Sequence, residues 1–573
     1  MDKKELADVL EEIGVLLELK GENPFKCRAY SNAAKVIEHT EEDINELVEL
    51  GKLSSIRGIG SGLSEKITEL VKTNRLKYYD NLKESIPPGH LEMLKIPGLG
   101  PKRIKAVHDK LEIKSIGELE YACKENRLID LDGFGLKSQE KILKGIEYLK
   151  KYSEQHLFSE AFSAAEKIYE ELKNHKDIIR LSIAGSLRRK KEVVKDIDFI
   201  ASSNNSKDVM DFFASLEEVN TVTAKGETKT SIILNTGINS DLRIVSDIQY
   251  PYALHHFTGS KDHNTLMRSR AKKMGMKMNE YGVFKGDELI VCRDEEEIFK
   301  ALELYFIPPE LREGLDEVDY AENNKIPKLI EEKDIKGIIH LHTTHSDGVS
   351  TIEEMAKAVE KMGYSYLGIA DHSKSAFYAN GLSEKRIIEQ HKEIDELNKN
   401  LKNIRILKGI EVDILPNGEL DYSDEVLKTF DFVIVSVHSN FGMSEVEMTE
   451  RIIKAMRNRY VNILGHPTGR LLLARESYKV DIEKIIDEAS NNSVILELNA
   501  NPHRLDIDWR DLRYAYEKNV RISINPDAHR IDGIKDVKYG VGIARKGWSV
   551  PDNVINTFSY EEIMKVFSSR ACP

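Results

Sequence analysis

The sequence predicts a multidomain protein with a helical first part, an α+β middle part and an α/β final part. Its 573 residues exceed the size at which a single hydrophobic core usually suffices. Apolar residues recur at helical spacing near the start, at Leu6, Val9, Leu10 and Ile13. From residue 335 onward, strand-like apolar runs alternate with helical patterns, which is typical of an α/β barrel or a doubly wound sheet.

Bulk composition narrows the class of protein. There is no run of about 18 apolar residues and no apolar core of a signal peptide, so we expect no membrane partner. Four cysteines, at positions 27, 123, 292 and 572, are scattered, which favours reduced thiols and a cytoplasmic location. The net charge of −13 argues against a nucleic-acid binder unless basic residues gather locally.

A glycine pattern repeats in the helical part. Ile56-Arg-Gly-Ile-Gly is echoed by Ile96-Pro-Gly-Leu-Gly, and a looser copy begins at Leu131. Glycines let the backbone approach a ligand, and the helix that follows offers free N–H groups to an anion. The pattern resembles the helix-hairpin-helix motif, which grips the DNA backbone without reading bases. The resemblance implies DNA contacts from these residues: Gly58, Gly60, Gly98, Gly100, Lys102 and Arg103.

Three acidic residues in the middle part predict a metal site. Asp196 and Asp198 are two residues apart, so in a β-strand both carboxylates point to one face. Asp241 lies in another strand-like run. Two like charges side by side favour a divalent cation between them, and three carboxylates could hold two Mg²⁺ or Mn²⁺ ions for phosphoryl transfer. The alternative is a solvated strand edge.

Gly185-Ser186 precedes the acidic pair, and together with Asp241 it resembles the nucleotidyltransferase palm of the DNA polymerase beta superfamily. The resemblance implies catalysis by the three aspartates, with Gly185, Ser186 and Arg189 holding a triphosphate. His255-His-Phe-Thr-Gly-Ser-Lys-Asp-His-Asn264 is similar to the nucleotide pocket of family X polymerases. It implies nucleotide or template contacts from His256, Phe257, Thr258, Gly259, Lys261, Asn264 and Arg268.

Two positions depart from the animal relatives. His256 stands where they usually have Tyr, so sugar discrimination can differ. Asn239 stands where they usually have Arg, which alters the surroundings of Asp241. Lys66 matches the lysine that attacks an abasic sugar in relatives of polymerase beta. A phosphate-binding lysine is the alternative for that position.

The final part ends several strands with His, Asp or Glu. Because active sites of barrels gather at the carboxyl ends of strands, we expect these residues to form one metal cluster. Imidazole and carboxylate ligands without cysteine suit Mn²⁺, Zn²⁺ or Fe²⁺, and we expect up to three ions. The candidate ligands are His340, His342, Asp347, His372, Glu411, His438, His466, Asp527 and His529.

This set resembles the polymerase and histidinol phosphatase (PHP) domain, a distorted TIM-like (β/α) barrel, with nine ligand positions filled. The resemblance implies a metal-dependent 3′-5′ exonuclease, with abasic-site cutting or 3′-phosphodiesterase activity as a further option. Arg470 and Arg504 follow strand ends and either clamp phosphate or lie at the surface.

The whole pattern resembles the bacterial or archaeal family X DNA polymerases. It implies a cytoplasmic, monomeric enzyme that fills short gaps in base excision repair, using dNTPs and gapped DNA with a recessed 3′ end. Two rivals are a template-independent nucleotidyltransferase with a phosphoesterase, and a DNA-binding scaffold with inactive sites. We expect a helical lyase-like domain at 1–80, fingers at 81–148, palm at 149–247, thumb at 248–317, a linker at 318–334 and a PHP domain at 335–573.

Overall fold

The structure is a computed structural model that describes residues 3–40, 42–56, 58–96, 98–129, 131–150 and 154–571. The chain divides into two compact units, Met1–Leu149 and Lys150–Pro573. Cys27, Cys123 and Cys292 carry free thiols and are buried, whereas Cys572 lies outside the described residues. Each helix in the described ranges is too short or too polar to span a bilayer.

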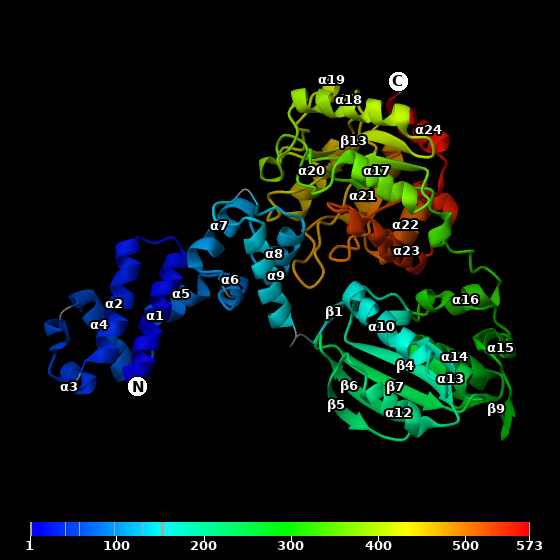
Figure 1. The fold of residues 1–573 in the computed structure, drawn as a ribbon, viewed down its shortest axis with the longest axis horizontal. Helices are drawn as coiled ribbons and strands as arrows, with labels where there is room; N and C mark the ends of the chain where they lie inside the picture. The colour runs from blue at the N-terminus through cyan, green and yellow to red at the C-terminus, as the bar shows by residue number, and fades with distance from the viewer. Residues whose placement is uncertain are drawn as a thin grey trace. The chain divides into compact units, whose positions relative to one another are not determined.

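The first unit is helical (Figure 1), and the buried apolar residues described in it form one hydrophobic core. The apolar face predicted for the first helix lies in it, because Leu6, Leu10 and Ile13 are buried. Its helices are α1 (Lys3–Leu19), α2 (Pro24–His39), α3 (Ile44–Glu49), α4 (Ser61–Thr73), α5 (Lys77–Glu84), α6 (Pro88–Met93), α7 (Pro101–Leu111), α8 (Ile116–Lys124) and α9 (Leu136–Lys150).

The second unit begins with a five-stranded sheet in the order β2-β4-β7-β6-β5, in which β4 and β7 are parallel (Figure 1). Residues alternate between the two faces of β4. Phe199 packs on one face with α10 and α12, and Ile200 packs on the other with α13 (Tyr250–Thr258). Asp196 and Asp198 therefore share the face of Ile200. The elements are β1 (His156–Leu157), α10 (Phe158–Lys173), β2 (Ile178–Ile183), α11 (Gly185–Arg188), β3 (Val193–Val194), β4 (Asp196–Ser203), α12 (Ser206–Ala214), β5 (Val219–Lys225), β6 (Lys229–Leu234) and β7 (Asn239–Val245).

A smaller α+β segment follows and has its own core around Tyr252 and Phe299. Its elements are α13 (Tyr250–Thr258), α14 (Lys261–Lys273), β8 (Met276–Asn279), β9 (Gly282–Lys285), β10 (Glu288–Ile290), α15 (Glu295–Ala301) and α16 (Glu317–Glu322). Residues 318–334 overlap α16, and Leu329 and Ile330 within them are buried in two different cores. This segment therefore packs against the parts on both sides of it.

The last part is a seven-stranded parallel sheet whose strands follow one another in chain order. A bridge joins Leu341, at the end of the first strand, to Ala528 in the segment just after the last strand, so the sheet forms a nearly closed barrel. Helices surround it (Figure 1), and one core lies between helices and sheet while a second, around Phe432 and Phe567, fills the inside.

The barrel strands are β11 (Gly337–Leu341), β12 (Tyr366–Ile369), β13 (Arg405–Asp413), β14 (Phe432–Ser436), β15 (Ile463–Leu464), β16 (Ile495–Asn499) and β17 (Ile522–Asn525). The helices are α17 (Ile352–Lys361), α18 (Glu384–Asn400), α19 (Asp424–Leu427), α20 (Glu445–Met456), α21 (Ile482–Asn492), α22 (Trp509–Glu517), α23 (Val537–Lys546) and α24 (Tyr560–Ala571).

Candidate active sites and DNA-binding motifs

The first glycine of each repeated motif adopts a left-handed backbone. The φ angle is +104° at Gly58, +82° at Gly98 and +85° at Gly133. Gly60 and Gly100 then stand at the N-caps of α4 and α7. An ideal Cβ at Gly98 would meet no atom of the described residues within 4 Å, so the backbone angle rather than crowding requires glycine. The sequence repeat is thus a repeated turn before a helix, whose first N–H groups lack intrahelical partners.

Lys102 and Arg103 differ in their surroundings. The Lys102 side chain is 83% exposed. The Arg103 guanidinium donates to the carbonyls of Gly98 at 2.7 Å and Gly133 at 2.6 Å. Arg103 therefore links the second turn to the third, and Lys102 is the more accessible cation for a DNA phosphate.

Lys66 lies on α4 and is half-buried. Its ammonium donates to the carbonyl of Gly62 at 3.2 Å and lies 5.0 Å from the centre of the Tyr78 ring. A cation at this position that keeps part of its surface in solvent can contact a DNA phosphate. The lyase role stays a prediction.

The three palm carboxylates come from two adjacent parallel strands. Asp198 of β4 is the direct neighbour of Asp241 of β7, and Asp196 is the neighbour of Asn239. The Lys229 ammonium of β6 lies 2.5 Å from Asp241. Strand pairing therefore brings together the three residues that the sequence separated by 45 positions at most.

The electrostatics support one shared site. The pKa of Asp198 is raised to about 7, first by burial and then by the charges of Asp196 and Asp241. The pKa of Asp196 is also raised, by burial and by Asp241. Carboxylates that resist ionisation beside one another fit a site that gains a divalent cation.

Gly185 makes room for this cluster. Its φ is +62°, and an ideal Cβ would lie 2.3 Å from Oδ2 of Asp198. Both features require glycine. The residue begins α11, which also contains the half-buried Ser186, so the predicted turn is a short helix packed directly against a catalytic candidate.

Arg188 and Arg189 both contact the end of α13. Arg188 donates to Thr258 Oγ1 at 2.6 Å and pairs with Glu295 at 2.5 Å. Arg189 donates to the Thr258 carbonyl, and its Nε lies 3.2 Å from Glu313 Oε1. The two arginines thus connect the palm to the nucleotide-pocket sequence.

The other predicted pocket residues lie on α13 and α14 or between them. The amide of Asn264 donates to the His256 carbonyl at 2.8 Å, which ties the two helices together. The Arg243 guanidinium lies 4.4 Å from the centre of the Phe257 ring. Arg243 was not predicted, although its place two residues after Asp241 on a strand was a usable signal. The remaining residues are Gly259, which has φ +69°, and the exposed Lys261 and Arg268.

The barrel brings all nine of its predicted ligands to one end of the sheet. Eight of them form three overlapping groups whose ligand atoms lie within 4.8 Å of one another. The ninth, His466, has Nε2 3.1 Å from Glu411 Oε1. The groups are His342, Asp347, His372 and His529; His340, His342 and Asp527; and His372, Glu411 and His438.

The donor set fits metal ions. Nε2 of His340 is buried and has no hydrogen-bond partner among the described residues. It lies 3.5 Å from Glu411 and 3.6 Å from Asp527, close to the roughly 3.0–3.5 Å that separates two ligands of one ion. Backbone strain also supports a metal site, because strained residues gather at functional sites. His340 has φ +63° and Asp527 has φ +51°, which non-glycine residues rarely adopt.

Charge in the cluster is balanced internally. Burial lowers the pKa of His372, but Asp347 and Glu411 outweigh it and raise that pKa to about 10. The pKa of Glu411 falls well below its usual range, because His438 and His340 outweigh burial. Ionised carboxylates stay in place at neutral pH, and bound cations would replace the protons on the rings.

Two carboxylates that were not predicted orient the ligands. Glu497 lies 2.5 Å from Nδ1 of His340, and Asp413 lies 2.6 Å from Nδ1 of His438. Each contact leaves Nε2 of the histidine for a metal. A lone acidic residue within the apolar strand Ile495–Asn499 was the available signal for Glu497.

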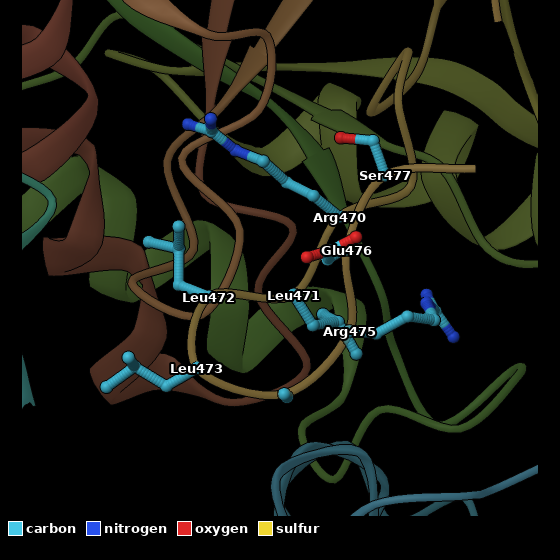
Figure 2. Close-up of a pocket in the computed structure, with 8 residues that line it drawn as sticks. Arg470, Leu471, Leu472, Leu473, Arg475, Glu476 and Ser477 are labelled. Atoms are coloured by element: carbon cyan, nitrogen blue, oxygen red, sulfur yellow. The ribbon is translucent and has the colours of Figure 1, made fainter. Parts of the chain in front are cut away.

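The two arginines considered near this cluster have different roles. Arg470 pairs with Asp508 at 2.5 Å and donates to the Arg504 carbonyl at 3.0 Å, so it holds its own loop. Arg504 is buried, and its Nε lies 3.8 Å from the ligand Asp527. Figure 2 shows the loop 470–477, which lines a hollow of about 640 Å³, with the guanidinium groups of Arg470 and Arg475 directed apart.

Four family matches agree with this geometry. Residues 1–76 match a helix-hairpin-helix domain, 91–147 a SAM-like helix-hairpin-helix tandem, 253–313 the DNA polymerase beta thumb and 339–501 the PHP domain. The chain is 42% identical over 568 residues to the DNA polymerase/3′-5′ exonuclease PolX of Bacillus subtilis, covering 98% of this chain and 99% of that protein. It is also 33% identical over 202 residues to a probable phosphatase of Acetivibrio thermocellus, covering 33% of this chain and 78% of that protein.

Fold and sites define a DNA polymerase of the polymerase beta type joined to a metal-dependent hydrolase domain. The near full-length match to one relative fixes the family. The chain belongs to the family X DNA polymerases that carry a C-terminal PHP domain. The family predicted from the sequence is confirmed.

Proposed function

We infer that this protein is a template-directed DNA polymerase that fills short gaps during base excision repair, with a metal-dependent 3′-5′ exonuclease in its PHP domain. The observation that carries the inference is the pairing of Asp198 with Asp241 on adjacent strands, with Asp196 two residues away on the same face. The relative from Bacillus subtilis, whose name gives both activities, supports it.

Asp196, Asp198 and Asp241 would hold two Mg²⁺ or Mn²⁺ ions in the palm. When bound, the ions would neutralise the charge that develops on the phosphates during in-line transfer. We assign Asp241 as the acceptor of the primer 3′-OH proton. The ammonium of Lys229, 2.5 Å away, offsets the negative charge of Asp241.

The side chains between palm and thumb would position the incoming nucleotide. Gly185, Ser186 and Arg189 would hold the triphosphate, and the contact of Arg189 with the Thr258 carbonyl places its side chain beside the pocket. The ring of Phe257 would stack under the sugar. The remaining assignments are His256 beside the sugar, Thr258 and Gly259 at the turn, Lys261 at the phosphates, Asn264 at the minor-groove edge of the base and Arg268 at the template strand.

In the barrel, the nine ligands would hold up to three ions of Mn²⁺, Zn²⁺ or Fe²⁺. When bound, such ions supply a nucleophile at neutral pH by lowering the pKa of water. Buried Arg504, beside Asp527, would bind the scissile phosphate. Glu497 and Asp413 would keep His340 and His438 in the tautomers that bind metal.

We propose that the protein acts as a monomer and that its first unit binds DNA through the three glycine turns. We propose that this unit consists of a lyase-like domain at 1–80 and a fingers domain at 81–148. In the second unit, the palm would end at residue 247, the thumb at 317 and the linker at 334, where the PHP barrel follows. Contacts from the turns to phosphates would not depend on base sequence. Gapped DNA with a recessed 3′ end is the substrate that needs both polymerase and backbone grip.

Primer extension tests this function. The purified protein would be given a one-nucleotide gap and, separately, the same primer as a single strand, with Mg²⁺ or Mn²⁺. Extension by the templated nucleotide on the gap, together with shortening of the single strand, is the expected result. Addition of nucleotides to the single strand would favour a template-independent nucleotidyltransferase, and no reaction on either substrate would favour a scaffold.

A further inference from the structure

A lysine of the PHP barrel lies buried beneath the nucleotide pocket. Lys546 is the last residue of α23, and 1% of its surface is exposed. Its ammonium donates to the Arg189 carbonyl at 3.2 Å and to the Glu310 carbonyl at 3.4 Å. It also donates to a carboxylate oxygen of Glu313. A buried ammonium is retained only when such partners compensate for lost hydration.

Glu313 is shared between the barrel and the palm. Its Oε1 accepts from Lys546 and lies 3.2 Å from Nε of Arg189. Burial raises the pKa of Glu313, but Lys546 and Arg189 outweigh burial, so the pKa falls below its usual value. The carboxylate is therefore charged at neutral pH and attracts both Lys546 and Arg189, with Lys191 as a more distant third cation at 4.0 Å.

The backbone of α23 follows the same part of the palm. An ideal Cβ at Gly542 would lie 3.4 Å from Cδ of Lys190, the residue after Arg189. Lys190 has φ +55°, and its ammonium lies over the rings of Phe158 and Phe162 at 5.1 and 4.6 Å. The barrel helix thus packs against the turn that carries Arg189.

Lys546 and Arg189 are both attracted to Glu313, so removing the charge of one of these three residues changes the electrostatic forces on the other two. Without the Lys546 ammonium, the buried Glu313 carboxylate would depend for counter-charge on Arg189 at 3.2 Å and, at 4.0 Å, on Lys191. A triphosphate would then compete with Glu313 for Arg189. Without the Glu313 charge, Arg189 would keep its contact with the Thr258 carbonyl and would be more available to an anion.

We propose that Lys546 is a positioning residue for nucleotide binding: by neutralising Glu313, this PHP-domain lysine keeps Arg189 available to the incoming triphosphate. The proposal rests on the proposed polymerase function and extends it, because it makes the PHP barrel part of the nucleotide site. It acts through Glu313 and does not require the barrel's metal ions.

The test compares single-nucleotide gap filling by three variants with that of the full-length wild type. Lys546→Met should raise the KM for dNTP about five- to tenfold, as expected for loss of one charge-assisted contact, with kcat within about twofold. Glu313→Gln should leave this KM unchanged or lower it. Arg545→Met is the matched control, because Arg545 is the neighbouring residue on α23 and pairs with Glu310 at 2.8 Å.

If Lys546→Met raises the KM for dNTP and Glu313→Gln does not, Lys546 positions Arg189. If both variants raise this KM, the substitutions only loosen the packing of α23 against the palm. A rise in KM for both Lys546→Met and Glu313→Gln, or an equal rise for Arg545→Met, would overturn the proposal. An unchanged KM for Lys546→Met would do the same. If Lys546→Met does not fold, Glu313→Gln and the double variant Lys546→Met/Glu313→Gln decide: the double variant should keep a near wild-type KM. A wild type that incorporates nothing would remove the proposed function instead.

Discussion

Replacing Gly185 by alanine should disable the polymerase site while sparing the barrel. The new Cβ would lie 2.3 Å from Oδ2 of Asp198, about 1.1 Å inside the 3.4 Å at which ordinary contact begins. The carboxylate must move by about that distance, and a misplacement of roughly 1 Å at a reacting centre costs on the order of 100-fold in rate. The backbone adds about 1–2 kcal/mol of strain, because alanine disfavours φ +62°. We therefore expect kcat for gap filling to fall by about 100-fold or more.

The assay is single-turnover incorporation on a one-nucleotide gap, with exonuclease activity on a single strand measured in parallel. Gly286→Ala is the matched control, because Gly286 has φ +63° and an ideal Cβ there meets no atom of the described residues within 4 Å. It should carry the same backbone strain and keep its polymerase rate within about threefold. If Gly185→Ala incorporates nucleotides at a rate close to wild type, the placement of Asp198 against Gly185 does not matter for catalysis.

Three further predictions follow from the structure. The pKa of Asp198 is about 7 in the metal-free protein, above its unfolded value, so this carboxyl costs stability as pH rises from about 4 to about 7. The apparent Mg²⁺ affinity should rise between about pH 6 and 8, and calorimetry should detect release of a proton on binding. An Mg²⁺ affinity that does not change with pH would refute this. Glu497→Gln should weaken metal binding in the barrel by about 10- to 100-fold and reduce the exonuclease activity, because His340 loses its charged partner. Gap filling should stay intact. Equal loss of both activities would contradict the role assigned to Glu497. Gly98→Ala should lower the melting temperature, because alanine at φ +82° costs about 1–2 kcal/mol. It should also weaken DNA binding equally for all DNA sequences. A loss of DNA affinity that depends on the DNA sequence, measured in a salt titration, would argue against binding to the DNA backbone.

The sequence was most informative where chemistry follows the period of a strand. Two aspartates at i and i+2 share a face of any strand, so Asp196 and Asp198 could be paired before the fold was seen. Most of the barrel ligands were found because they follow an apolar run, and parallel strands bring such ends together. The glycine turns were found because a backbone with φ above zero favours glycine, and the resulting Gly-x-Gly pattern repeats along the sequence.

Residues that act through distant partners carry no such mark. Lys546 and Glu313 are 233 positions apart, and neither lies in a motif; their contact depends on how α23 packs against the palm. Arg470 and Arg504 look alike in sequence, yet loop packing turns Arg470 toward Asp508 and Arg504 toward Asp527. The Arg103 guanidinium donates to two loop carbonyls, which the sequence did not indicate, and its contact with a DNA phosphate stays a prediction. Tertiary packing decided each of these.

The central claim is that one chain carries two separate metal-dependent active sites. The most direct measurement follows extension and shortening of one labelled primer in the same reaction for Asp196→Ala and His342→Ala. Asp196→Ala should stop incorporation and keep shortening, and His342→Ala should keep incorporation and stop shortening. Loss of both activities in either variant, with the fold intact by circular dichroism, would contradict the account.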